Sequence, residues 1–230
     1  SDLKQAIQRE YLKCASDPVH FMRKYCTIQH PTKGKVKFDL YPFQEKCLTD
    51  FKDNRYNIIL KARQLGISTL SAGYSLWLML FHNDKNILVI ATGKETAKNL
   101  VTKVRVMYEG LPQWLKTGTE EINKLSLRFK NGSQIKAIAS NESAGRSEAL
   151  SLLIIDEAAF IDRIDTIWTA AQQTLATGGG CIALSTPNGV GNWFHKQWVG
   201  AEEGTNQFNT IKLHWTDHPE RTEEWRKEQD

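Results

Sequence analysis

The sequence predicts an α/β fold in which a mostly parallel β-sheet carries helices on both faces. Short, β-branched apolar runs alternate along the chain with longer segments of helical periodicity, which is typical of such a sheet. Polar segments follow three of the apolar runs: a loop at 61–68, the acids Asp156 and Glu157, and a turn at 185–188. Because ligands bind at the carboxyl ends of parallel strands, we expect all three on one edge of the sheet.

The first 40 residues are expected to form an N-terminal helical segment and a connector. Residues 1–30 are polar with a helical pattern, and Pro18 after Asp17 marks the start of a second helix. The stretch HPTKGKVKF at 30–38 is rich in turn-forming residues. We therefore expect a connector there, packed on the core that follows.

The rest of the chain alternates between strand and helix signals. Apolar runs predict buried strands, and segments with apolar residues at helical spacing predict the helices between them. Between the second and third runs, residues 125–139 alternate apolar and polar side chains around Asn131-Gly132, a strong signal for a β-hairpin insertion. Strands are expected at 56–60, at 86–92, in 150–160 up to the two acids, in 181–189 up to the Pro-Asn-Gly turn, and at 208–215. Helices are expected at 68–81, 97–111, 162–180 and 193–198.

Composition limits the possible classes of protein. The chain has 230 residues, of which 40% are hydrophobic and 24% charged, and its net charge is +4. These values fit a globular domain and allow nucleic acid as a partner without requiring it. No apolar run approaches the roughly 18 residues of a membrane span, so no membrane association is expected. The four cysteines lack a C-x-x-C spacing, and we expect them to be reduced and mostly buried rather than metal ligands.

The loop LKARQLGIST at 60–69 resembles the phosphate-binding pattern G-x-x-x-x-G-K-[ST] with its lysine missing. Gly66 and Ser68 fit the pattern, Ile67 occupies the lysine position, and Lys61 occupies the first glycine position. A lysine side chain spans about 6 Å, so Lys61 could place its charge over the loop. Ser68, with Thr69 beside it, offers a hydroxyl for Mg²⁺. The alternative for this loop alone is a surface turn before a helix.

Asp156 and Glu157 follow four apolar residues. In phosphoryl transfer, one such carboxylate holds Mg²⁺ through water and the other orients and deprotonates the attacking water. An ordinary strand end capped by acids is the alternative. The acids and the glycine loop together predict a P-loop NTPase of the ASCE/RecA-like class that hydrolyses ATP.

Three motifs in this order resemble the ATPase domain of the bacteriophage terminase large subunit, of the T4-like type. They are KARQLGIST, LLIIDEAAF and LSTPNG, and the resemblance extends upstream through DPVHFMRKYCTIQHPTKGKVKFDLYPFQ to cover about 20–215. The resemblance implies an ATPase core at 41–215. It also implies that 216–230 begins a linker toward a nuclease domain that this chain is too short to contain.

The resemblance implies a role for each matching residue. Lys61 is similar to a displaced phosphate-binding lysine, Arg63 to a residue that stabilises the γ-phosphate, and Gln44 to a glutamine that reads adenine. Ser185 and Thr186 resemble a motif that couples hydrolysis to movement. Arg146 resembles an arginine finger that enters a neighbour's site, although contact with solvent or DNA is the alternative. The nucleotide-binding set is completed by Ala62, Gln64, Leu65, Gly66, Ile67, Ser68, Thr69 and Asp156.

The family also implies partners. ATP and Mg²⁺ are the expected ligands, double-stranded DNA the substrate, and the portal protein and small terminase subunit the expected partners of a homo-oligomeric ring in the host cytoplasm. A basic surface at Lys94, Lys98, Lys103 and Arg105 could contact DNA phosphates, or it could be a solvated helix face. Two alternatives remain: a superfamily 2 helicase-like DNA translocase, and a nucleotide-binding scaffold without hydrolysis.

Overall fold

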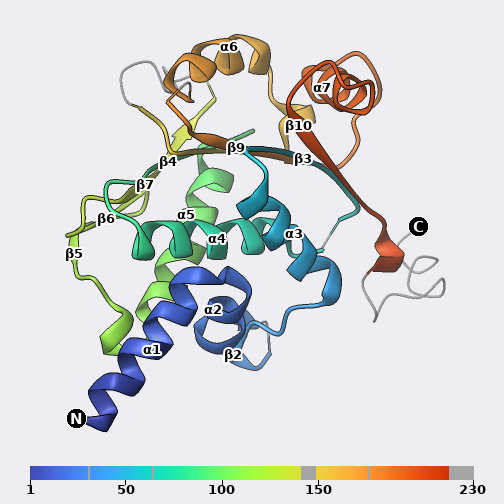
Figure 1. Ribbon diagram of the computed structural model, residues 1–230. Helices are drawn as coiled ribbons and strands as arrows, with labels where there is room; N and C mark the ends of the chain where they lie inside the picture. Colours follow the sequence, from blue (N-terminus) through green and yellow to red (C-terminus); the bar gives the residue numbers. More distant parts are fainter. Residues whose placement is uncertain (31, 64, 141–148, 176, 218–230) are drawn as a thin grey trace.

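A single large β-sheet organises the chain (Figure 1). The computed structural model describes residues 1–30, 32–63, 65–140, 149–175 and 177–217. Among these residues, the central sheet has eight strands. Their order across the sheet is β10 (Phe208–Leu213), β3 (Tyr56–Lys61), β9 (Gly180–Ser185), β8 (Leu152–Asp156), β4 (Asn86–Ala91), β7 (Gln134–Ala139), β6 (Ser126–Phe129) and β5 (Thr119–Ile122).

The sheet is parallel from β10 through β7 and antiparallel from β7 through β5. All five strands predicted from apolar runs are present, as β3, β4, β8, β9 and β10. The strand in the 150–160 segment ends at the acids, as predicted: β8 ends at Asp156, and 158–160 forms the 3₁₀ turn η2 (Ala158–Phe160). The strand in the 181–189 segment ends at Ser185, where the predicted turn begins. Turn residues beyond these two points end the pairing.

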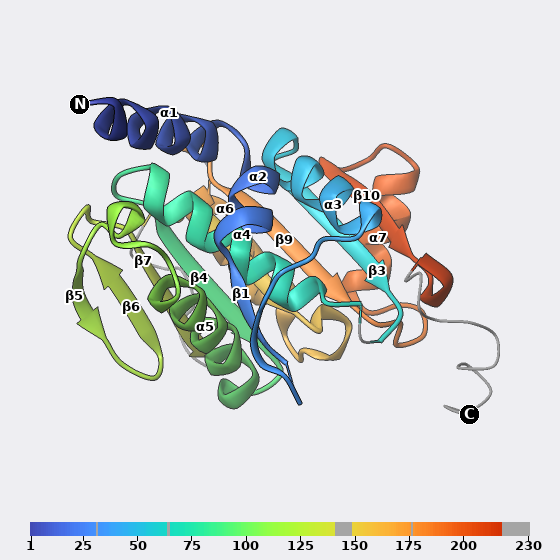
Figure 2. The ribbon, with the colours of Figure 1, turned by 90° about the horizontal axis from the view of Figure 1, so that it is seen from below.

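Helices cover both faces of the sheet, as predicted. One face carries α1 (Asp2–Ser16), α2 (Pro18–Tyr25), α3 (Pro42–Asp53), α4 (Ile67–Phe81) and α5 (Lys94–Glu109), and Figure 2 looks onto this face. The other face carries α6 (Ile164–Leu175) and α7 (Trp193–Glu202) (Figure 1). The strand residues are buried between two hydrophobic clusters, one for each face. Short 3₁₀ turns lie at η1 (Gln113–Leu115) and η3 (Trp215–Asp217). No helix in the described parts of the chain has the length and apolar character to cross a membrane.

The N-terminal segment contains a strand pair that the sequence did not reveal. The second helix begins at Pro18, as predicted, with the Asp17 side chain accepting a hydrogen bond from the Val19 amide. The prediction of helix to residue 30 and a connector to 38 is wrong, because β1 (Thr27–His30) and β2 (Gly34–Lys37) form an antiparallel hairpin. The backbone is already extended at Cys26. The hairpin supplies hydrogen-bond partners for backbone N–H and C=O groups that an unpaired connector would leave without them.

The predicted hairpin at 125–139 is present as β6 and β7, but it extends the main sheet. β7 pairs in parallel with β4, so the hairpin adds strands to the sheet beside the parallel core. Gly132 in its turn has a φ of 87°, which favours glycine. An additional strand, β5, was not predicted, because its sequence TEEI has no alternation of apolar residues and three of its residues are exposed.

Candidate functional site

The three polar segments singled out from the sequence lie together, as predicted. They follow β3, β9 and β8, which are neighbours in the sheet with β9 in the middle. In the parallel register Leu60 is level with Ser185, and Asp156 is level with Leu184. Because all three strands run in the same direction, the ends of the strands place the glycine loop, the acids and the 185–188 turn on one edge.

A chain of polar contacts connects these strand ends. The Lys61 ammonium lies 3.4 Å from Oε1 of Glu157, and the Thr186 hydroxyl donates a hydrogen bond of 2.9 Å to Oε2 of the same carboxylate. The Lys61 side chain is only 11% exposed and that of Glu157 27% exposed. Glu157 has a φ of 52°, a strained conformation that persists only where surrounding contacts hold it. Both oxygens of this carboxylate are therefore held, one from β3 and one from the turn after β9.

Ser68 and Asp156 form a second pair beside the contacts among Lys61, Glu157 and Thr186. The Ser68 hydroxyl donates a hydrogen bond of 3.1 Å to Oδ2 of Asp156, whose residue is 5% exposed. Burial raises the pKa of Asp156, and the nearby Lys61 ammonium and the Ser68 hydrogen bond oppose that rise. Oxygen ligands from a hydroxyl and a buried carboxylate are the chemistry that Mg²⁺ prefers. The residues expected to hold the metal therefore lie side by side.

The glycine loop opens directly onto α4. Gly66 has a φ of 72° and precedes the first residue of α4, and no side chain caps this helix end. The first amides of α4 are thus left to an anionic ligand. Ser68 and Thr69 are half-buried on the first turn. In contrast, Leu65 and Ile67 are each 1% exposed and belong to the hydrophobic core. The side chain at the usual lysine position therefore lies in the core.

Gln44 braces the loop from the start of α3. Its side-chain amide donates to the Leu65 carbonyl at 3.2 Å, and its side-chain oxygen accepts from the Tyr41 amide at 3.0 Å. The residue is 4% exposed. A role in reading adenine would require Gln44 to exchange its bond to Leu65 for one to the base.

A cavity of about 520 Å³ lies over the contacts among Lys61, Glu157 and Thr186. It is lined by Lys61, Arg63, Thr92, Glu157, Phe160 and Thr186. Arg63 is exposed and Ala62 half-buried. Thr92 and Phe160 were not anticipated. The signal that could have found them is their place at the ends of predicted strands: Thr92 ends the 86–92 run, and Phe160 follows the two acids.

Two of the expected site residues, Gln64 and Arg146, lie outside the described residues. Two of the basic residues of α5 pair with acids on the same helix. Lys98 pairs with Glu95 at 3.2 Å and Arg105 with Glu109 at 4.0 Å, both along the helix. Lys103 is half-buried, and burial lowers its pKa while the nearby carboxylate of Asp156 opposes the effect. Lys103 thus lies within the electrostatic range of the Asp156 site.

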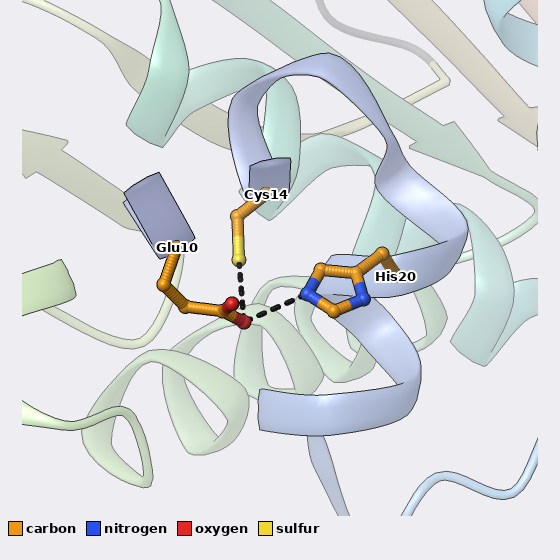
Figure 3. A group of neighbouring side chains, drawn as sticks. All are labelled: Glu10, Cys14 and His20. Carbon is orange, nitrogen blue, oxygen red and sulfur yellow. Dashed lines mark hydrogen bonds and ion pairs between the residues drawn. The ribbon is translucent and has the colours of Figure 1, made fainter. Parts of the chain in front are cut away.

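A second cluster of potential metal ligands joins α1 to α2 (Figure 3). Oε1 of Glu10 lies 2.7 Å from Nε2 of His20, 2.8 Å from the Tyr25 hydroxyl, 3.2 Å from the Lys24 ammonium and 4.0 Å from Sγ of Cys14. These donors satisfy the carboxylate and compensate its charge, so the cluster fastens the two helices together. All four cysteines are buried with free thiols.

Comparisons with known proteins identify a family and several relatives for most of the chain. A family model described as "Terminase large subunit, T4likevirus-type, N-terminal" matches residues 58–229. The probable terminase large subunit gp28 of Escherichia phage Mu is 25% identical over 186 residues, which cover 74% of this chain. The chain spans only 33% of that phage Mu protein.

Solved structures share the fold. The ATPase domain of the Thermus phage P74-26 large terminase has a TM-score of 0.67 and 22% identity, over 84% of this chain and 88% of that one. The large terminase of bacteriophage HK97 has a TM-score of 0.68 and 17% identity, over 87% and 43%. The large terminase of a thermophilic bacteriophage, in complex with ATP-γ-S, has a TM-score of 0.63 and 16% identity, over 83% and 49%. The predicted P-loop NTPase fold is confirmed.

Proposed function

Because this chain belongs to the T4-type terminase large subunit family, we propose that it hydrolyses ATP to drive double-stranded DNA into a viral procapsid. The observation that carries the proposal is the arrangement of the Lys61–Glu157–Thr186 chain beside the Ser68–Asp156 pair. Together these supply a cation for phosphates, a base for water and oxygen ligands for a metal, the parts that ATP hydrolysis requires. The terminase structure with bound ATP-γ-S adds support from a protein of the same fold.

The triphosphate binds over Gly66, where the uncapped amides of α4 meet its negative charge. We assign the cation role of the missing lysine to Lys61. The Lys61 ammonium already points to the Glu157 carboxylate at this edge of the sheet, whereas Ile67 is buried in the core. Arg63, on the cavity wall, adds charge at the γ-phosphate. The side chains on the first turn of α4 and the backbone of the loop complete the nucleotide site.

Ser68 and Asp156 would hold Mg²⁺, since they present hard oxygen ligands side by side. When bound, Mg²⁺ neutralises charge that develops on the phosphate oxygens. The protein prepares this position by burying Asp156 beside the positive charge of Lys61. The Ser68 hydroxyl fixes the direction of the carboxylate.

Glu157 acts as the base. Its Oε1 is held by the ammonium of Lys61 in this structure. Arriving phosphates compete for that ammonium, which leaves the carboxylate able to accept a proton from an attacking water in the cavity. Thr186 continues to hold Oε2 and so keeps the carboxylate directed at the water. The backbone strain at Glu157 is consistent with a side chain positioned for chemistry.

The remaining assignments come from the family. Double-stranded DNA is the substrate that is moved, the portal protein and the small terminase subunit are partners, and a homo-oligomeric ring in the host cytoplasm is the active form. Arg146 acts as a finger in a neighbouring subunit, and Ser185 and Thr186 couple hydrolysis to movement. Gln44 contacts adenine after releasing the Leu65 carbonyl.

The test is a phosphate-release assay on purified protein with and without duplex DNA, in Mg²⁺ and in excess chelator. We expect steady hydrolysis that requires Mg²⁺ and rises with duplex DNA. Nucleotide binding without phosphate release under all conditions would instead support a non-hydrolysing scaffold. Stimulation by single-stranded but not duplex DNA would support a helicase-like translocase.

A further inference from the structure

We propose that Asn188 is a positioning residue that fixes the direction of Glu157 and joins the 185–188 turn to α7. The inference rests on the proposed ATPase function. Asn188 lies in the turn after β9, beyond the two hydroxyl residues that the family resemblance assigns to coupling. Its contacts reach the acids on one side and α7 on the other.

The first step concerns Ala159, two residues after Glu157. The Ala159 amide donates to the Ser185 hydroxyl at 3.1 Å, and the Ala159 carbonyl accepts from the Asn188 side-chain amide at 3.0 Å. The two ends of the 185–188 turn thus hold both polar groups of one buried residue. This grip fixes η2 immediately after Glu157.

The second step concerns the strain at Glu157. A non-glycine residue with a φ of 52° needs its surroundings to hold it. The Thr186 hydroxyl holds the side chain, and Ser185 and Asn188 hold the backbone that follows. If the Asn188 amide is removed, the 185–188 turn holds Ala159 only through the Ser185 hydroxyl, and the carboxylate loses part of its orientation.

The third step leads to α7. The Asn188 carbonyl accepts from the Asn192 side-chain amide at 2.9 Å, and Asn192 in turn caps α7 by accepting from the His195 amide at 2.9 Å. The next residues, Trp193 and Phe194, are buried in the same hydrophobic cluster as Ala159. The start of α7 is therefore connected to the 185–188 turn by hydrogen bonds, and to Ala159 by packing in the same hydrophobic cluster.

The consequence is a mechanical connection within one domain. When arriving phosphates draw the Lys61 ammonium away from Glu157, any resulting movement of Glu157 passes through the 185–188 turn to the first turn of α7. Asn188 belongs to both contacts: its side chain holds η2 and its carbonyl holds the helix cap. It acts through Glu157 and does not itself contact the phosphates.

The test compares two substitutions at Asn188 with a matched control. Asn188→Ala removes the amide, and Asn188→Asp keeps its size but cannot donate to the Ala159 carbonyl. The control is Asn206→Ala, which removes an amide that donates to the Gln197 carbonyl on α7 at 2.8 Å, away from Glu157. We expect both Asn188 variants to lower kcat about 10-fold to 100-fold, as for small misplacements of a catalytic group, with the KM for ATP within about twofold of wild type. Asn206→Ala should keep the wild-type kcat.

A second readout follows α7 directly. Hydrogen exchange of the α7 amides is measured with and without ADP and a transition-state-mimicking metal fluoride. In the wild type and in Asn206→Ala, the exchange of the first turn of α7 should change with the nucleotide, and in Asn188→Asp that change should be lost. A wild-type kcat in both Asn188 variants, or a loss of kcat equal to that in Asn206→Ala, would overturn the inference. Absence of hydrolysis in the wild type would instead refute the proposed function.

Discussion

The Lys61 ammonium and the Glu157 carboxylate lie 3.4 Å apart at the ends of two strands separated by β9. The amine from the leading end of the glycine loop thus reaches the residue proposed to activate water. Because Lys61 is only 11% exposed, its charge is directed into the site rather than into solvent. Nucleotide binding and water activation therefore share one ion pair, which the first two predictions test.

Lys61→Ala should lower kcat for ATP hydrolysis by about 10²–10³, the loss expected when one preorganised group that stabilises transition-state charge is removed. Lys98→Ala is the matched control, because it removes a lysine whose partner is Glu95 on the same helix. Steady-state phosphate release measures both. Normal turnover of Lys61→Ala would mean that another cation meets the phosphates.

Glu157→Gln should bind ATP yet hydrolyse it about 10²–10⁴ times more slowly, because an amide cannot accept the proton of the attacking water. Thr186→Val should give a smaller loss, since it removes only the hydrogen bond to Oε2. Fluorescent-nucleotide titration measures binding, and single-turnover phosphate release measures chemistry. Undiminished chemistry in Glu157→Gln would refute the assigned role.

Ile67→Ala should destabilise the fold by about 2–5 kcal/mol, because it leaves a cavity in the core. Ile67 is 1% exposed, so its substitution acts through stability rather than through the phosphates. The control Ile122→Ala removes the same side chain at a residue that is 49% exposed, and it should change stability by less than about 0.5 kcal/mol. Urea unfolding compares the two. Equal stabilities would contradict the burial of Ile67.

The same geometry predicts that Ile67→Lys cannot restore the usual loop. A lysine there would place an unpaired charge in the core, at a large cost in stability. Hydrolysis by the double variant Lys61→Ala/Ile67→Lys should therefore stay as low as in Lys61→Ala. Recovery of wild-type turnover would show that the side chain at 67 can turn toward the phosphates.

Gly66→Ala should weaken both the fold and ATP binding. Gly66 and Gly34 have the same φ of 72°, so alanine costs each about 1–2 kcal/mol through the left-handed backbone. At Gly66 the new Cβ would also lie 3.0 Å from the Gln44 side-chain nitrogen, whereas Gly34 has nothing within 4 Å. Chemical denaturation and nucleotide titration are the measurements. Only Gly66→Ala should lose ATP affinity, and equal affinities would argue against a role for the loop in binding.

Acid should loosen the attachment of α1 through Glu10. The hydrogen bond from His20, supported by those from Tyr25 and Lys24, lowers the pKa of Glu10 from 4.5 to about 2. A carboxyl group with a lowered folded-state pKa stabilises the fold above its unfolded value, and this contribution fades as the pH falls from about 4.5 toward 2. Protonation of Glu10 also removes the ion-pair partner of the Lys24 ammonium.

The check is the melting temperature of wild type and Glu10→Gln between pH 6 and pH 2.5. The difference in melting temperature between wild type and Glu10→Gln should be largest at pH 6 and should decrease as the pH falls. Glu95→Gln, which removes an exposed carboxylate on α5, serves as the control and should show no comparable narrowing. A difference that does not change with pH would show that Glu10 contributes no linked stability.

The sequence alone determined the α/β class, five of the six parallel strands and the shared edge of the three polar segments. It could do so because these properties are local: an apolar run of strand length and a turn signal are read from neighbouring residues. The helical spacing of apolar residues after Ala97 predicted one buried face, and its members are all buried: Ala97, Leu100, Val101, Val104, Met107, Tyr108 and Leu111. The family motifs are also local, so they identified the site from short segments.

Tertiary structure alone decided which side chains meet. Glu157 is held by Lys61 and Thr186, residues far from it in the sequence, and no periodicity encodes such a contact. Only packing shows that Ile67 belongs to the core and that Lys103 lies near Asp156 instead of on a solvated helix face. The physical reason is that a side chain's direction depends on the elements packed against it, and the sheet brings those elements together from distant parts of the chain.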